Sequence, residues 1–202
     1  MAEVEKQKVK PMRWGYLGLL ILPSVASLAA AASPVWSQAF AWGFASIITL
    51  LFIYSVVFIL LKQYEQEPLR LLYGTIVINI STVIILIASW RVFNENIWLG
   101  LLLLSLFICH VTFGITHRKR VNDAIRDPKK HPTLHRVYKR IIILLALLGP
   151  ASYGLSVALG SYFATDTILI VFASLGIPFA FFLSLITLSS LTFVLPTNED
   201  HE

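Results

Sequence analysis

A strongly basic segment lies between two long apolar parts of the chain. Residues 117–140 contain nine of the sixteen Lys and Arg residues of the sequence, against two Asp residues. A segment with this charge cannot lie in hydrocarbon, and short basic loops stay on the cytoplasmic side of a membrane. We therefore expect residues 116–140 to form a cytosolic loop that sets the orientation of the apolar segments before and after it.

The composition indicates the class of protein. The chain of 202 residues is 57% hydrophobic and 13% charged, with a mean hydropathy of +0.77, whereas soluble domains carry about 25% charged residues. This balance predicts an all-α, polytopic integral membrane protein. The formal net charge of +5 does not indicate nucleic-acid binding, because no folded basic domain with base-reading side chains remains outside the apolar segments.

The apolar runs predict a bundle of six transmembrane helices. A helix needs roughly 20 residues to cross a hydrocarbon core of about 30 Å, and six runs approach or exceed that length. Polar residues 1–13 precede the bundle, and an acidic tail, residues 196–202, follows it. The predicted spans cover residues 14–32, 40–61, 71–90, 97–115, 141–163 and 168–195.

Six crossings place both termini on the side of the basic loop. Fifteen of the sixteen Lys and Arg residues then lie on that side, and only Arg91 lies on the other. This asymmetry predicts cytosolic N and C termini. Since no organelle-targeting signal is evident, we expect a bacterial-type plasma membrane. A cleavable signal peptide is an alternative for residues 1–32, because a basic leader and an apolar run precede the small residues 29–33.

Prolines predict where the helices bend or begin. Pro23 is expected to kink the first span, and Gly176 and Pro178 to break or tilt the sixth. Pro132 suits the first turn of a helix that leads into the fifth span. Arg91 is assigned to the turn after the third span, so we expect no Asp, Glu, Lys or Arg within any span.

Polar side chains at membrane depth form the candidate site. Polar groups inside a bundle can line a solute path, although small residues that let helices approach closely give the same pattern. The residues of this candidate cavity are Asn79, His110, Ser152, Tyr153 and Ser184.

His110 could ligate a haem or a metal, or relay a proton. The alternative is a neutral imidazole bonded to Asn79 or to a hydroxyl on a neighbouring helix. No other predicted span contains a histidine, and a haem held by two histidines needs one, so we predict no cofactor. The single cysteine, Cys109, cannot form an intramolecular disulfide and is expected to fill space.

The loop residues give weak indications of catalysis. His131 and His135 are four apart and could share a metal on one helical face, but a third ligand is missing. Asp123 and Asp127 resemble part of the Asp-rich motifs with which membrane prenyltransferases hold Mg²⁺ and diphosphate. Because a second such motif is missing, pairing with loop cations is favoured. The motifs of zinc proteases and serine hydrolases are missing too, so the sequence favours a protein that is not an enzyme.

The basic loop predicts a surface for anionic lipid headgroups or for an acidic membrane-protein partner, at about 1 kcal/mol per cation near a membrane. We therefore expect an accessory or partner-binding subunit. The alternatives are a small-solute transporter or channel lined by the first, fifth and sixth spans, and a membrane enzyme or haem protein that uses His110. The residues of the predicted surface are Arg118, Lys119, Arg120, Lys129, Lys130, Arg136, Lys139 and Arg140.

Overall fold

A computed structural model describes residues 14–32, 34–126, 132–133, 135–137, 139–140, 143 and 165–191. Within these ranges the chain is helical and contains no strand. Five helices are long and apolar enough to cross a membrane: Gly15–Ala32, Gln38–Leu60, Glu67–Val92, Ile97–Thr116 and Ala173–Ser190. The prediction of an all-α protein with several membrane-spanning helices is confirmed for this part of the chain. Nearly all of the predicted fifth span, residues 1–13 and the acidic tail lie outside it.

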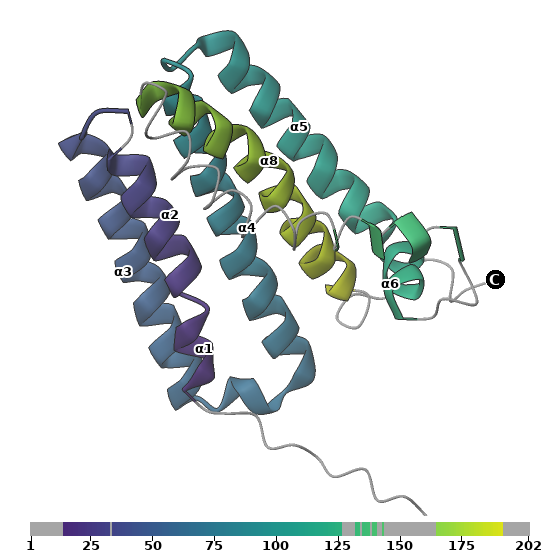
Figure 1. The fold of residues 1–202 in the computed structure, drawn as a ribbon. Helices are drawn as coiled ribbons and strands as arrows, with labels where there is room; N and C mark the ends of the chain where they lie inside the picture. Colours follow the sequence, from purple (N-terminus) through teal and green to yellow (C-terminus); the bar gives the residue numbers. More distant parts are fainter. Residues whose placement is uncertain are drawn as a thin grey trace, which may run out of the picture.

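The helices stand side by side around a central one (Figure 1). The elements are α1 (Gly15–Gly18), α2 (Ile21–Ala32), α3 (Gln38–Leu60), η1 (Gln63–Glu65), α4 (Glu67–Val92), α5 (Ile97–Thr116), α6 (Arg118–Arg126) and α8 (Thr165–Ser190). Helix α4 packs against α2 on one side and against α8 on the other, and α8 also contacts α5 and α6. We call the end where α4 stops the Arg91 end, and the opposite end the α6 end.

The first span is divided between α1 and α2, which confirms the expected effect of Pro23. Proline has no N–H for the carbonyl of Leu19, four residues earlier, and its ring crowds that carbonyl. The chain accordingly turns at Leu19 and Leu20, with bonds from Leu19 N to Tyr16 O (3.3 Å) and from Leu20 N to Leu17 O (3.1 Å). This break places Tyr16 against the aromatic residues of α3 and α4.

The sixth span was expected either to tilt or to break at Gly176 and Pro178, and the break does not occur, since α8 continues through Pro178. Pro178 is exposed on the surface of the described bundle. Packing against α4 on the opposite face holds α8 in one piece. Gly176 contributes to this packing, since a Cβ there would lie 3.5 Å from the Ile85 side chain.

A tyrosine on α4 fastens the first two spans near the α6 end. Tyr73 is fully buried and stacks on Phe58 of α3, with ring centroids 4.5 Å apart. Its hydroxyl lies 2.7 Å from the Ser55 hydroxyl and 3.1 Å from the Tyr16 carbonyl oxygen, while the Ser55 hydroxyl lies 2.6 Å from the Leu51 carbonyl oxygen. Two protons serve three contacts, so the short chain from Tyr73 through Ser55 to Leu51 is favoured over the longer contact with Tyr16.

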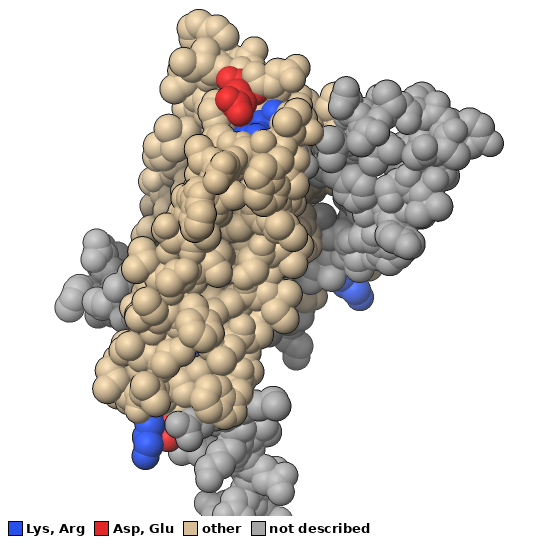
Figure 2. Space-filling model, turned by 90° about the vertical axis from the view of Figure 1, so that its left-hand side faces the viewer, with Lys and Arg blue, Asp and Glu red and all other residues tan. Residues whose placement is uncertain are grey.

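The outer surface of the bundle is apolar. Large side chains such as Leu50 of α3 and Leu106 of α5 are exposed, which suits a lipid solvent rather than water. The described surface in Figure 2 carries its charged side chains near its two ends and beside the grey region, with an uncharged length between them.

Candidate functional site

Three hydroxyls of α4 lie within hydrogen-bond distance of backbone carbonyls of α8. The distances are 2.9 Å from Thr75 Oγ1 to Thr187 O, 3.1 Å from Thr82 Oγ1 to Ala180 O and 3.3 Å from Ser89 Oγ to Ala173 O. Each hydroxyl also lies 2.9–3.0 Å from the carbonyl oxygen four residues earlier on α4, so its single proton is shared between the two acceptors. The donors are seven residues apart on α4 and the acceptors seven residues apart on α8, in the opposite direction. This hydroxyl ladder defines an antiparallel pairing of α4 with α8.

Two residues of the candidate cavity meet within this ladder. The Ser184 hydroxyl donates to Asn79 Oδ1 at 2.7 Å, and Asn79 Nδ2 donates to the Thr75 carbonyl at 2.8 Å. Ser184 is fully buried. Hydrogen bonds between membrane helices average only about 0.6 kcal/mol, so several such contacts together stabilise the pair and fix its register.

His110 lies away from that pair. Its ring packs against Phe181 of α8, with centroids 4.9 Å apart, and its Nε2 is buried without a hydrogen-bond partner in the described part of the chain. The alternative bond to Asn79 is therefore not made, because Asn79 bonds to Ser184 and Thr75. Ser152 and Tyr153 lie outside the described residues, so the five-residue cavity stays a prediction.

Arg91 is a site that the sequence interpretation missed. It lies in the last turn of α4 rather than in the turn that follows, and its side chain is only 4% exposed. The expectation that the spans contain no charged residue is therefore wrong at this position. An arginine near a helix end can extend toward the neighbouring helices, and this reach is invisible in a hydropathy profile.

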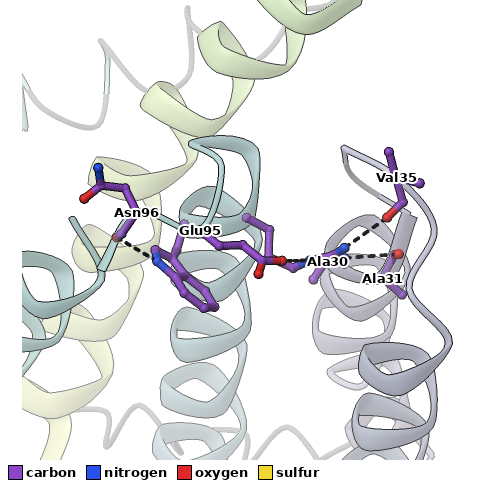
Figure 3. A network of polar contacts seen from close by, with 7 residues as sticks. Ala30, Ala31, Val35, Glu95 and Asn96 are labelled. Carbon is purple, nitrogen blue, oxygen red and sulfur yellow. Dashed lines mark hydrogen bonds and ion pairs between the residues drawn. The ribbon is translucent and has the colours of Figure 1, made fainter. Parts of the chain in front are cut away.

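The Arg91 guanidinium binds the carbonyl end of α2, where Figure 3 labels the acceptor residues Ala30, Ala31 and Val35. Its nitrogens donate to the carbonyl oxygens of Ala30, Ala31 (3.2 Å) and Val35 (2.9 Å). The last carbonyls of a helix lack intrahelical donors and carry partial negative charge, so a buried cation satisfies both requirements. Its Nε lies 3.4 Å from the half-exposed carboxylate of Glu95. We call this arrangement the Arg91 clamp.

The turn after α4 is built around the clamp. Asn94 and Glu95 have left-handed backbones, with φ of 58° and 53°. Asn96 then caps α5, since its side chain accepts from the backbone N–H of Trp98 (2.9 Å) and Leu99 (3.2 Å). The Asn96 carbonyl accepts from the indole N–H of Trp90 at 2.9 Å. The turn thereby fixes both Glu95 and the Trp90 ring.

Two grooves open on the described surface, and both are mainly apolar. One, of about 330 Å³, lies between Val83–Trp90 of α4 and Gly100–Phe107 of α5. The other, of about 490 Å³, lies beside the break in the first span, between residues 17–25 and Ile48–Phe52 of α3. Ser24 and Thr49 are the polar residues of the second groove, and Thr49 bonds to its own helix at 2.8 Å.

The predicted basic surface is described in part. Arg118, Lys119 and Arg120 begin α6, which packs against α5 and α8, and the first two are half-buried. Pro132, Thr133 and residues 135–137 and 139–140 are helical, in agreement with the predicted helix from Pro132. Lys129 and Lys130 lie outside the described residues. The exposed cations are Arg120, Arg136, Lys139 and Arg140.

Groups of three or more His, Cys, Asp or Glu residues that could hold a metal do not occur in the described ranges. Asp123 lies half-buried on α6, while its predicted partner Asp127 and the histidine at position 131 are outside those ranges. Cys109 is exposed on α5. The described part of the chain therefore contains three polar features: hydrogen bonds between helices, a buried arginine and an exposed basic surface.

Comparisons with protein-family models, with curated proteins and with solved structures found no match for this chain.

Proposed function

We propose that this chain is a six-span protein of a bacterial-type cell membrane, with cytosolic termini, that acts as an accessory or partner-binding subunit through its basic surface. Two lines of support are the directions of the helices and the exposure of the cations.

The direction of α8 supports a sixth crossing. Gly114 of α5 lies against Leu188, and His110 lies against Phe181, so residue numbers on the two helices rise together. Since α6 directly follows α5 at the α6 end, residues 127–164 must return to the Arg91 end before α8 begins. A backbone that crosses hydrocarbon must be helical to satisfy its polar groups, and the apolar run 141–163 is long enough.

Labelling with a membrane-impermeant maleimide tests this orientation. On a Cys109→Ala background, we expect Trp98→Cys to react in intact cells. Lys139→Cys and Lys6→Cys should react only after lysis, because six crossings put both on the cytosolic side. The proposed topology is contradicted if Lys139→Cys and Lys6→Cys react from opposite sides.

The exposed cations carry the functional proposal. In the described spans, Thr75, Asn79, Thr82, Ser89 and Ser184 all bond to each other or to backbone groups, and the two grooves are mainly apolar. This arrangement favours packing over a polar solute path. The exposed charge of Arg120, Arg136, Lys139 and Arg140 suits a partner with clustered carboxylates or phosphates.

Binding of a fluorescent deca-glutamate peptide to the chain in neutral-lipid nanodiscs tests the basic surface. Changing the four exposed cations to Gln should weaken binding by up to about three orders of magnitude, because an exposed ion pair contributes about 0.2–1 kcal/mol. The effect should shrink at high salt.

A matched control changes Lys6, Lys8, Lys62 and Arg70 to Gln, which removes the same charge from the same predicted side of the membrane. We expect this variant to keep most of the binding. Equal losses in both variants would show that net charge, rather than the basic surface, attracts the peptide. Solute flux through proteoliposomes that Asn79→Leu abolishes would favour the transporter instead.

A further inference from the structure

The groove between α4 and α5 has walls suited to hydrocarbon. Its lining is apolar on both helices, and the indole N–H of Trp90 is already bonded to the Asn96 carbonyl. The ring lies close to Gly100, where a Cβ would come within 3.0 Å of Nε1. Glycine at this position and the bond to Asn96 hold the indole in place as a rigid end wall.

The size of the groove distinguishes between occupants. The eight residues from Val83 to Trp90 span about 10 Å along α4, and the volume over that length is about 330 Å³. Divided by that length, the volume corresponds to a cross-section of about 33 Å², which is smaller than that of a helix about 10–12 Å across with its side chains. One extended acyl chain fits where a partner helix does not.

Charge at the Arg91 end specifies the headgroup. Arg91 and Glu95 are the charged residues whose side chains the structure describes at this end, and Arg91 is buried while Glu95 is half-exposed. Glu95 is tied to the groove by the hydrogen bond from its backbone N–H to the Trp90 carbonyl, at 3.2 Å. The buried Arg91 guanidinium pairs with the Glu95 carboxylate at 3.4 Å, and the exposed part of the carboxylate, beyond the Trp90 end of the groove, can accept a hydrogen bond from a cationic headgroup.

We propose that this groove binds one acyl chain of a phospholipid whose headgroup ammonium is held by Glu95. The chain fills the space along Leu103 and Leu104, and the ammonium donates to the exposed side of the Glu95 carboxylate. The ligand class is an ethanolamine phospholipid. The site lies at the end of the bundle opposite to α6, so it is separate from the basic surface.

Quenching of Trp90 fluorescence by brominated acyl chains reports on this groove alone. The test uses a variant that keeps Trp90 and carries Phe at the other four tryptophans, in nanodiscs with brominated phosphatidylethanolamine or phosphatidylglycerol. We expect at least a fivefold preference for phosphatidylethanolamine. A second variant that keeps only Trp98, which is 77% exposed on the lipid-facing side of α5, should show no preference.

Three variants separate the contribution of the acyl chain from that of the headgroup. Leu104→Phe should reduce quenching by both lipids because it fills the groove. Leu102→Phe, at a side chain of similar exposure (54% against 55%) outside the groove, should leave quenching unchanged. Glu95→Gln should abolish the headgroup preference and keep the quenching.

Several outcomes would overturn the proposal. Equal quenching of Trp90 by the two lipids would contradict the contact between Glu95 and the headgroup. The same lipid preference at Trp98 would show that the protein selects this lipid over its whole surface rather than in the groove. Equal effects of Leu102→Phe and Leu104→Phe would show that the acyl chain does not bind in the groove. Trp90 quenching that appears only on dilution to monomers would show that a second copy of the chain covers the groove instead.

Discussion

Replacing Arg91 with methionine is expected to lower the free energy of unfolding by about 3–5 kcal/mol, the usual cost of removing one partner of a buried charged contact. The substitution removes three donors from the carbonyls of Ala30, Ala31 and Val35. It also removes the contact of the guanidinium with the Phe40 ring, 4.5 Å from its centroid. Equilibrium unfolding in mixtures of dodecyl sulfate and a mild detergent measures the change.

Two further variants make this prediction specific. Arg91→Lys should recover only part of the loss, since an ammonium lacks the planar fork that reaches several acceptors. Arg70→Met changes the same residue type in the first turn of the same helix, at a half-buried side chain, and should cost less than about 1 kcal/mol. The Arg91 clamp would be dispensable if Arg91→Met and Arg70→Met had equal effects.

Replacing Gly114 with alanine is expected to destabilise the fold by about 1–3 kcal/mol through overpacking. A Cβ on Gly114 would lie 2.8 Å from Cδ1 and 3.1 Å from Cβ of Leu188, which is itself buried. The side-chain tip can rotate away, but the Leu188 Cβ can retreat only with its backbone, so α5 and α8 must separate. The same unfolding measurement detects the loss.

A second substitution tests the cause. Leu188→Ala removes Cδ1 but keeps Cβ, so it should relieve part of the clash, and the double variant should be more stable than the sum of the two single effects predicts. Gly74→Ala is the matched control, because a Cβ there meets no atom within 4 Å. That change should be neutral or stabilising by up to about 1 kcal/mol, the helix preference of alanine over glycine. Equal losses at Gly74 and Gly114 would refute the close approach.

The sequence predicted the elements better than their contacts. Apolar runs place each described span within a few residues of its position, because burial in lipid depends on the summed hydropathy of a segment. Arg91 was misplaced because its neighbours Trp90 and Asn94 resemble an interface turn, although its side chain reaches back to α2. A residue-by-residue hydropathy profile contains no information on that direction.

The residues of the candidate site were also predictable from the sequence only in part. Asn79 and Ser184 were singled out as polar residues at depth, and the structure joins them at 2.7 Å. The spacing of Thr75, Thr82 and Ser89 was a usable signal for one polar helical stripe. Its partner could not be read from α8, because the acceptors are backbone oxygens that every residue possesses.

This choice of acceptors has a consequence for how the protein can vary. Main-chain oxygens persist through any substitution, so α8 can change its side chains at the ladder positions without losing an acceptor. The constraint at Ala173 and Ala180 is on side-chain size, because both residues are buried where α4 comes close. Homologous chains could therefore exchange Ala, Gly and Ser at these two positions, while each hydroxyl lost from α4 would remove one contact of about 0.6 kcal/mol.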